Sequence, residues 1–178
     1  MTGSERNLDL SPTESANLLG SIMSAMKPEF PHLNIGWNAE PNAPEPHVEV
    51  HGFDIILRFY VNPFRFKEFE EDEIGFLRFV NVAPYRLGPT NDEGWYRAQC
   101  RFSQIAPKWG EFYEVSSDSE TLKGPTDWRV LNTRTVEAHH FLFYFRDNTF
   151  ECVAERCLFE PRADNALQRT RKHLPLFG

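Results

Sequence analysis

The strongest constraint on the fold is a pair of aromatic-rich segments in the C-terminal part of the chain. Residues 139–146 and 149–159 flank Asp147-Asn148, two residues that tolerate the positive φ of a tight hairpin turn. A two-residue loop would make one face of the hairpin apolar and the other mixed, whereas a longer loop would shift the register. The opposed pairs would be Phe145 with Phe150, Phe143 with Cys152 and Phe141 with Ala154 on the apolar face, and Tyr144 with Glu151, Leu142 with Val153 and His140 with Glu155 on the mixed face. The pattern predicts an antiparallel β-hairpin against a hydrophobic core.

Strand-like alternation of apolar and polar residues also occurs earlier in the chain. The alternating apolar positions are Ile55, Leu57, Phe59 and Val61, and then Tyr96, Ala98, Cys100 and Phe102. An apolar stretch at residues 74–82 lies between these two sets. The chain contains 16 Phe, 5 Tyr and 4 Trp, and rings of this size favour a pleated, half-buried surface. We therefore expect a protein built mainly of antiparallel strands.

The N-terminal region carries the signals of one amphipathic helix. Ser11 can cap it, Pro12 suits the first helical position, and Glu14 can complete a capping box. Pro28 would end it. The apolar stripe consists of Leu18, Leu19, Ile22, Met23 and Met26. This spacing predicts a helix over residues 12–26.

Together these elements predict an α+β fold. Six or seven strands would form a curved, mostly antiparallel sheet, packed against the helix at residues 12–26. The alternative is a β-sandwich with peripheral helices. Residues 1–178 are expected to form one domain, with residues 1–10 frayed, residues 28–46 as a proline-rich extended crossing, and residues 161–178 as a tail that includes a short helix.

The overall composition narrows the classes of function. The formal net charge of −7 disfavours general nucleic-acid binding, which needs a basic face. The start of the chain lacks the apolar core of a secretory signal, and no apolar run is long enough to cross a bilayer. We expect a cytoplasmic protein whose three cysteines are free thiols. If Cys152 and Cys157 share a strand, their odd spacing points them to opposite faces and they cannot pair.

One candidate metal site stands out in the sequence. His47, Glu49 and His51 alternate, so that an extended strand would project all three from one face. Imidazole and carboxylate groups at this spacing can bind a divalent metal, although a complete site needs a further ligand from elsewhere. Surface residues on an edge strand explain the same pattern, and we expect no cofactor or metal.

A candidate acid–base pair lies in the C-terminal hairpin. His140 opposite Glu155 would place a carboxylate where it can orient the imidazole ring. No nucleophile motif accompanies the pair. A polar cross-strand pair without catalytic function is therefore the preferred interpretation.

Two surfaces could bind a protein partner. The first is an acidic run that contains Glu70, Glu71, Asp72 and Glu73. The second is the polar face of the strand predicted around residues 95–103, where Trp95 would lie beside Arg97 and Arg101. We therefore expect a non-enzymatic interaction protein, of the immunity or antagonist type, with a basic protein as partner. The alternative is a small-molecule-binding protein or enzyme with an aromatic-lined pocket between sheet and helix.

Overall fold

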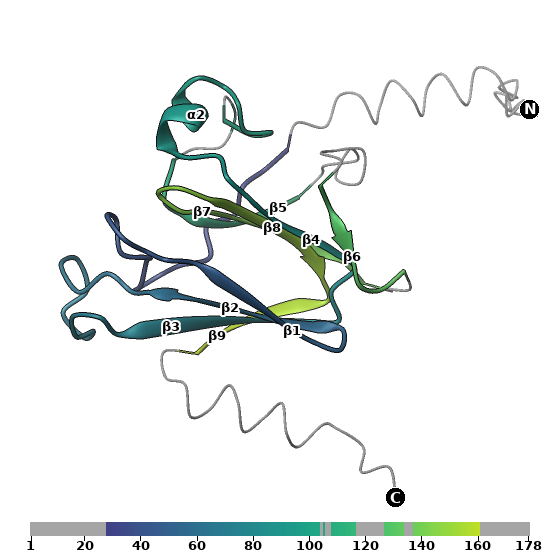
Figure 1. The fold of residues 1–178 in the computed structure, drawn as a ribbon, viewed down its shortest axis with the longest axis horizontal. Helices are drawn as coiled ribbons and strands as arrows, with labels where there is room; N and C mark the ends of the chain where they lie inside the picture. Colours follow the sequence, from purple (N-terminus) through teal and green to yellow (C-terminus); the bar gives the residue numbers. More distant parts are fainter. Residues whose placement is uncertain (1–27, 104, 106–107, 117–126, 134–136, 161–178) are drawn as a thin grey trace, which may run out of the picture.

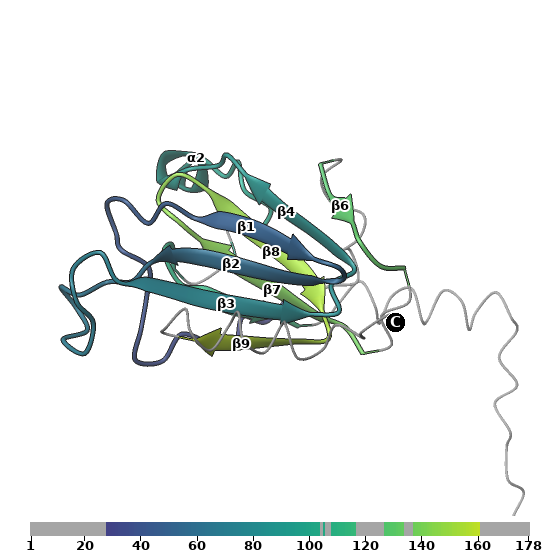
Figure 2. The same ribbon diagram turned by 60° about the horizontal axis from the view of Figure 1, so that its bottom comes forward.

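Two antiparallel sheets face each other in the computed structural model, which describes residues 28–103, 105, 108–116, 127–133 and 137–160. Figures 1 and 2 show them as two stacked layers. The first sheet contains β1 (His47–His51), β2 (Asp54–Tyr60), β3 (Ile74–Val80) and β9 (Arg156–Glu160), in the order β1-β2-β3-β9. The second contains β5 (Phe112–Val115), β7 (His139–Tyr144), β8 (Thr149–Ala154), β4 (Pro84–Gly88) and β6 (Arg129–Val130), in that order. The expectation of a mainly antiparallel β-protein is confirmed.

The hydrophobic core fills the space between the two sheets. Strand β2 shows the expected alternation, because Ile55, Leu57 and Phe59 all point inward and are buried. The second sheet contributes the apolar face of the C-terminal hairpin, with Phe143 and Phe150 among its buried members. Because the inner face of each sheet is buried in this core, apolar residues occupy every second position along the strands.

The outer face of the second sheet is covered as well. Tyr113, Leu142 and Tyr144 on this face pack with Phe102 in a second buried cluster. Trp95 and Trp109 close this cluster from the connection between β4 and β5, which includes the short helix α2 (Asp92–Tyr96). Figure 1 shows α2 on the outer side of this sheet. The second sheet is therefore a middle layer over part of its area.

The predicted hairpin is present, but its register differs from the one predicted for a loop at Asp147-Asn148. The last paired residues are Tyr144 and Thr149, and Phe143 lies opposite Phe150. The Phe145 N–H also donates across the hairpin to the Asn148 carbonyl at 2.8 Å, so the turn lies at Arg146-Asp147, and the Phe145 ring packs in the core on Phe143 with 4.1 Å between ring centroids. The resulting shift is two residues, so each side chain keeps its face. The predicted pairing of His140 with Glu155 is wrong, since His140 lies opposite Val153.

The segment predicted as one strand over residues 149–159 divides into two strands in different sheets. β8 ends at Ala154, and β9 begins at Arg156 in the first sheet. Glu155 makes the crossing, and its backbone N–H donates to the carbonyl of Val80. The idea of Cys152 and Cys157 on one strand is therefore wrong.

The strand predicted from the alternation of residues 96–102 is also wrong. Asn91 caps α2, because its side-chain oxygen accepts a hydrogen bond from the Gly94 N–H. Asp92 and Glu93 occupy the first turn, where negative charge favours a helix. The chain then continues in turns, and Ala98 has a φ of 60°. The apolar spacing reflects packing of Cys100 and Phe102 on the sheet rather than a strand.

The expected α+β architecture is not supported by the described residues, in which helix is limited to one short element. The helix predicted over residues 12–26, the frayed residues 1–10 and the tail at residues 161–178 all lie outside the described residues. No helix in the described part of the chain is long and apolar enough to cross a membrane.

The proline-rich segment at residues 28–46 contacts both sheets and forms only isolated β-bridges, without a regular strand. Its first part runs beside β5, where Glu29 bridges Ser116. Its later part reaches the end of β2, where Ala39 bridges Val61. Trp37 lies between these contacts and is buried in the core.

Candidate functional site

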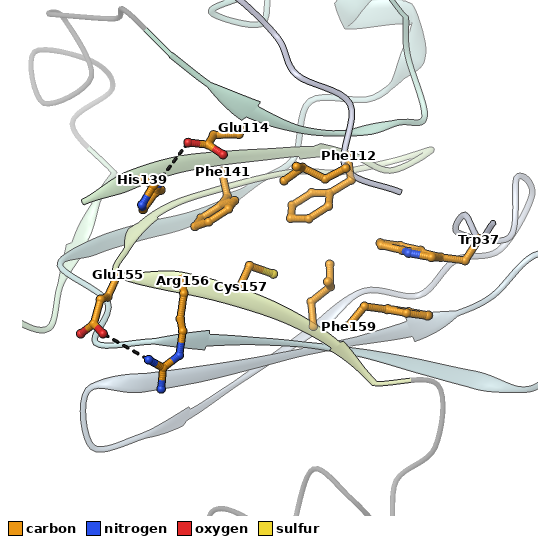
Figure 3. Close-up of a pocket in the computed structure, with 11 residues that line it drawn as sticks. Trp37, Phe112, Glu114, His139, Phe141, Glu155, Arg156, Cys157 and Phe159 are labelled. Atoms are coloured by element: carbon orange, nitrogen blue, oxygen red, sulfur yellow. Dashed lines mark hydrogen bonds and ion pairs between the residues drawn. The ribbon is translucent and has the colours of Figure 1, made fainter. Parts of the chain in front are cut away.

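A cleft opens between the two sheets along the side where β9 and β5 lie. Its volume is about 340 Å³. Both sheets contribute to its walls, and the proline-rich segment adds two residues (Figure 3). The lining residues are Leu33, Trp37, Leu77, Phe112, Glu114, His139, Phe141, Glu155, Arg156, Cys157 and Phe159. We refer to this space as the inter-sheet cleft.

Aromatic rings form most of the apolar lining of the inter-sheet cleft. Trp37 and Phe159 stack in parallel, with centroids 4.0 Å apart and an interplanar angle of 4°. On the wall from the second sheet, Phe112 and Phe141 also stack, with centroids 6.0 Å apart. Figure 3 shows the Phe112 and Phe141 rings facing the side chains of β9 across the opening. Flat apolar walls of this kind suit a flat or compact apolar molecule.

Two ion pairs lie at the polar end of the inter-sheet cleft. His139 Nδ1 lies 2.7 Å from the Glu114 carboxylate on the second sheet. Arg156 donates to the Glu155 carboxylate over 3.3 Å at the edge of the first sheet. The His139 and Arg156 side chains are both largely exposed. The cleft therefore has an apolar interior and an opening with one carboxylate and one basic side chain on each side.

A cysteine thiol contributes to the floor of the inter-sheet cleft. Cys157 lies on β9, and its sulfur points into the opening (Figure 3). Burial among apolar side chains raises the pKa of the Cys157 thiol well above its ordinary value. The thiol is therefore neutral at physiological pH and acts as a small apolar group rather than as a nucleophile.

A second, more polar cavity of about 490 Å³ lies beside Glu111. The Glu111 carboxylate accepts hydrogen bonds from Asn34 at 2.8 Å and Asn38 at 3.3 Å, and it contacts His32 at 2.9 Å. Arg65 reaches its other oxygen over 3.4 Å. Burial alone would raise the pKa of Glu111, but these hydrogen bonds and the charges of His32 and Arg65 outweigh it and lower the pKa. The carboxylate is fully engaged by its protein partners.

A third hollow of about 460 Å³ lies between the acidic run and the proline-rich segment. Its charged lining residues are all acidic: Glu40, Glu45, Glu71 and Asp72. Tyr60 and Phe64 add two aromatic rings, and Phe64 is largely exposed. We refer to this space as the acidic hollow. Its charge favours a cationic group.

A buried ionic cluster lies on the outer face of the second sheet. Glu151 has a side chain that is only 1% exposed, and it contacts Arg86 at 3.2 Å and Arg101 at 3.4 Å. His140 Nε2 lies 3.1 Å from the same carboxylate. The cluster fastens the connection between β4 and β5 to the sheet, because Arg101 belongs to that connection. The Glu151 and His140 side chains are both buried.

The structure separates the two residues of the candidate acid–base pair. His140 is buried beside Glu151, on the outer face of the second sheet. Glu155 lies at the crossing between the sheets, where its carboxylate contacts Asn81 and Arg156. The sequence placed them together only through the incorrect hairpin register.

The residues of the candidate aromatic–basic partner surface are also dispersed. Trp95 is half-buried and packs on Trp109 and Tyr144. Arg97 is exposed and pairs with Glu93, whereas Arg101 is held by Glu151. The acidic run is different, since Glu70, Glu71 and Asp72 are exposed and Glu73 is half-buried in the loop before β3.

His47, Glu49 and His51 lie on β1, as the alternation predicts. His51 Nε2 lies 3.6 Å from a Glu49 oxygen. Within one copy of the described chain, no three His, Cys, Asp or Glu side chains are arranged to hold a metal ion.

The sequence interpretation missed the residues that form the inter-sheet cleft. Trp37 and Glu114 come from segments far from the C-terminal hairpin in sequence, and no local motif joins them to it. The only local signal is the predicted aromatic hairpin, whose two segments supply His139, Phe141, Glu155, Arg156, Cys157 and Phe159. No protein-family model, no curated protein and no solved structure matches the chain.

Proposed function

We propose that this protein binds a small, mainly apolar molecule in the inter-sheet cleft. The observation that carries the proposal is an aromatic-lined opening between two sheets whose core is otherwise filled. A closed sandwich would have side chains from both inner faces interlocking along this side. Here Phe112, which is only 2% exposed, and the partly exposed Phe159 instead line a cleft of about 340 Å³. The pocket proposed here lies between the two sheets, whereas the sequence-based alternative placed an aromatic-lined pocket between a sheet and the helix predicted over residues 12–26, which lies outside the described residues.

The dimensions and polarity of the cleft indicate the class of ligand. A volume of about 340 Å³ is near the lower end of the range for small-molecule sites, roughly 300–1,000 Å³. A single- or double-ring compound fits such a space better than a long acyl chain. Arg156 uses one nitrogen in its contact with Glu155 and is exposed, so it has further N–H groups to donate. The ligand class that we propose is a ring compound with one group, such as a carboxylate, that accepts hydrogen bonds from Arg156.

A pair of neighbouring substitutions on β9 tests the proposal. Cys157→Phe places a ring in the inter-sheet cleft, because the Cys157 side chain points into it. Leu158→Phe is the matched control, since Leu158 is the next residue, faces outward and is 37% exposed. The probes are benzoate, indole-3-acetate and 1-naphthoate, monitored by quenching of tryptophan fluorescence and by native mass spectrometry. Trp37 reports directly because it lines the cleft.

We expect saturable binding of at least one probe to the unmodified protein and to Leu158→Phe, with about tenfold or greater loss in Cys157→Phe. Thermal unfolding of both variants establishes that they remain folded. Equal binding by both variants would place the ligand elsewhere. Absence of binding by all probes, together with no small molecule retained after native purification, would contradict the proposal.

A second candidate function is recognition of a basic protein segment by the acidic hollow. The specific observation is that four carboxylates and two aromatic rings border this hollow without a cationic side chain. A lysine or arginine side chain could enter it, gaining charge attraction from the carboxylates and cation–π contact with Tyr60 or Phe64. This agrees with the basic partner expected from the acidic run.

Charge-neutral substitutions test the acidic hollow. Glu71→Gln with Asp72→Asn removes two charges, and Asn tolerates the positive φ of 61° at position 72. Glu93→Gln with Asp147→Asn removes the same charge elsewhere and is the control. The probe is a hexa-arginine peptide, measured by calorimetry at low and moderate salt. Only the first pair should weaken binding by about fivefold or more; equal weakening by both pairs would indicate non-specific attraction and contradict a defined site.

A further inference from the structure

Strand β1 forms one edge of the first sheet, and its outer edge is unpaired among the described residues. β1 pairs only with β2, and no further backbone hydrogen bond from the described chain reaches residues 47–51. Gly52, with a φ of 65°, begins the two-residue turn that connects β1 to β2. Such an edge presents free N–H and C=O groups to another strand.

The three outward side chains of β1 supply metal ligands but do not complete a site in one copy. His51 Nε2 and the nearest Glu49 oxygen are 3.6 Å apart. Two ligand atoms bound to one tetrahedral zinc ion at about 2.0–2.2 Å are roughly 3.4 Å apart. These two groups are therefore already close to a shared coordination geometry. His47 lies two residues beyond Glu49 on the same face, too far along the strand to join His51 at one ion.

The sequence of β1 is a palindrome, HVEVH, and this symmetry determines how two copies would pair. An antiparallel pair of β1 strands that overlaps over its full length has its two-fold axis at Glu49. Each His51 then lies opposite His47 of the second copy, on the same face, with Cβ atoms about 4.5–5.5 Å apart. The valines would face each other on the inner side. Each end of the paired strands would collect two imidazoles and one carboxylate.

We propose that two copies of this chain pair through β1 and bind two zinc ions, each held by Glu49 and His51 of one copy and His47 of the other. Two histidines and one carboxylate are an established zinc-binding combination, with water in the fourth position. The ion also removes an obstacle to pairing, because the same register places Glu49 opposite its own copy. Like charges directly opposite destabilise a strand pair. Dimer formation should therefore depend on the metal.

The remaining contacts of Glu49 are compatible with this role. Arg58 Nε lies 3.7 Å from the second Glu49 oxygen, so it can hold the carboxylate while the first oxygen binds the metal. The Glu49 and Arg58 side chains are both partly exposed. Neither must leave a buried position when zinc binds. This site is independent of the inter-sheet cleft, because β1 and β9 lie at opposite edges of the first sheet (Figure 2).

Sedimentation analysis of the full chain with and without Zn²⁺ tests the proposal. The unmodified protein should be a monomer in EDTA and a dimer with zinc, with two zinc ions per dimer measured by elemental analysis. Glu49→Gln and His51→Asn should each raise the zinc concentration for half-maximal dimerisation by about tenfold or more, since even supporting residues around a metal cost 10–100-fold. His139→Asn removes another exposed histidine and should leave dimerisation unchanged.

Three results would overturn the proposal. One is a monomer at all zinc concentrations up to those that precipitate the protein. Another is a dimer that persists in EDTA, and the third is a zinc-dependent dimer that His139→Asn weakens as much as His51→Asn. Circular dichroism of each variant confirms an unchanged fold, which is expected because these side chains lie at the protein surface.

Discussion

A buried charged residue, Glu151, shows where burial of a charge opposes folding and has to be compensated. The Glu151 carboxylate is almost completely buried and is compensated by two arginines and a histidine that come from three different segments. Burying a charge is costly unless it is paired and hydrogen-bonded. The cluster therefore stabilises one arrangement of the connection between β4 and β5 against the sheet.

Neutralising Glu151 should destabilise the protein strongly. Glu151→Gln removes the buried anion that Arg86 and Arg101 both contact, and we expect a loss of about 3 kcal/mol in the free energy of unfolding. Glu155→Gln is the matched control, because its side chain is 40% exposed and pairs with exposed Arg156. It should change stability by less than about 1 kcal/mol. Urea unfolding measures both, and similar losses would show that burial of Glu151 carries no special cost.

Glu111 should make stability depend on pH in the acidic range. Folding lowers the pKa of Glu111 below its ordinary value of 4.5, so the ionised carboxylate stabilises the native state above that pH. This contribution is lost as the pH falls through the lowered native pKa. The difference in unfolding free energy between the unmodified protein and Glu111→Gln should therefore be largest above about pH 4.5 and shrink below it. Urea titrations from pH 7 to pH 3 measure it, and a constant difference would contradict the assignment.

At the level of elements, the sequence predicted which face of a strand is buried wherever apolar and polar residues alternate along the whole strand. The alternation from Ile55 to Val61 and the aromatic hairpin both predicted the correct faces, because each inner face is buried along its length. Register and strand ends were not predictable from the same pattern. They depend on Phe145 packing on distant Phe59, 5.6 Å away between centroids, and on the crossing at Glu155. The strand expected at residues 96–102 is wrong because Asn91 caps a short helix just before it, and the alternation alone does not reveal this cap.

Gly75 tests how tightly the strands of the first sheet pack on one another. A Cβ at this position would meet Val61 Cγ1 at 2.6 Å and Phe159 Cε2 at 3.2 Å. Gly75→Ala should therefore cost about 1–3 kcal/mol by overpacking. Gly52→Ala is the comparison, because a Cβ there meets nothing within 4 Å and only the positive φ opposes it, at about 1 kcal/mol. Thermal unfolding should rank Gly75→Ala as the more destabilising change, and the reverse order would show that this contact relaxes freely.

At the level of the whole molecule, the proposed binding site arises from the way the chain alternates between sheets. The inter-sheet cleft joins Trp37 from the crossing segment, Phe112 from β5 and Phe159 from β9, residues that are widely separated in sequence. Local sequence patterns cannot reveal such a site, because each of these aromatic residues alone has the pattern of an ordinary core residue. The candidate ligands on β1 were predictable, because three alternating positions in one strand share a face.

The same topology predicts that the two sheets unfold together. One buried cluster draws residues from both sheets, and β8 continues directly into β9 across the gap between them. Phe159→Ala removes a ring that stacks on Trp37, and it should cost about 2–4 kcal/mol. Tryptophan fluorescence and far-ultraviolet circular dichroism should nevertheless give coincident urea transitions for the unmodified protein and for this variant, as expected of one cooperative unit. Leu158→Ala, on the outward face of the same strand, should shift both transitions much less. If Phe159→Ala separated the two signals into distinct transitions, the first sheet would be able to unfold without the second, and the shared core would not couple them.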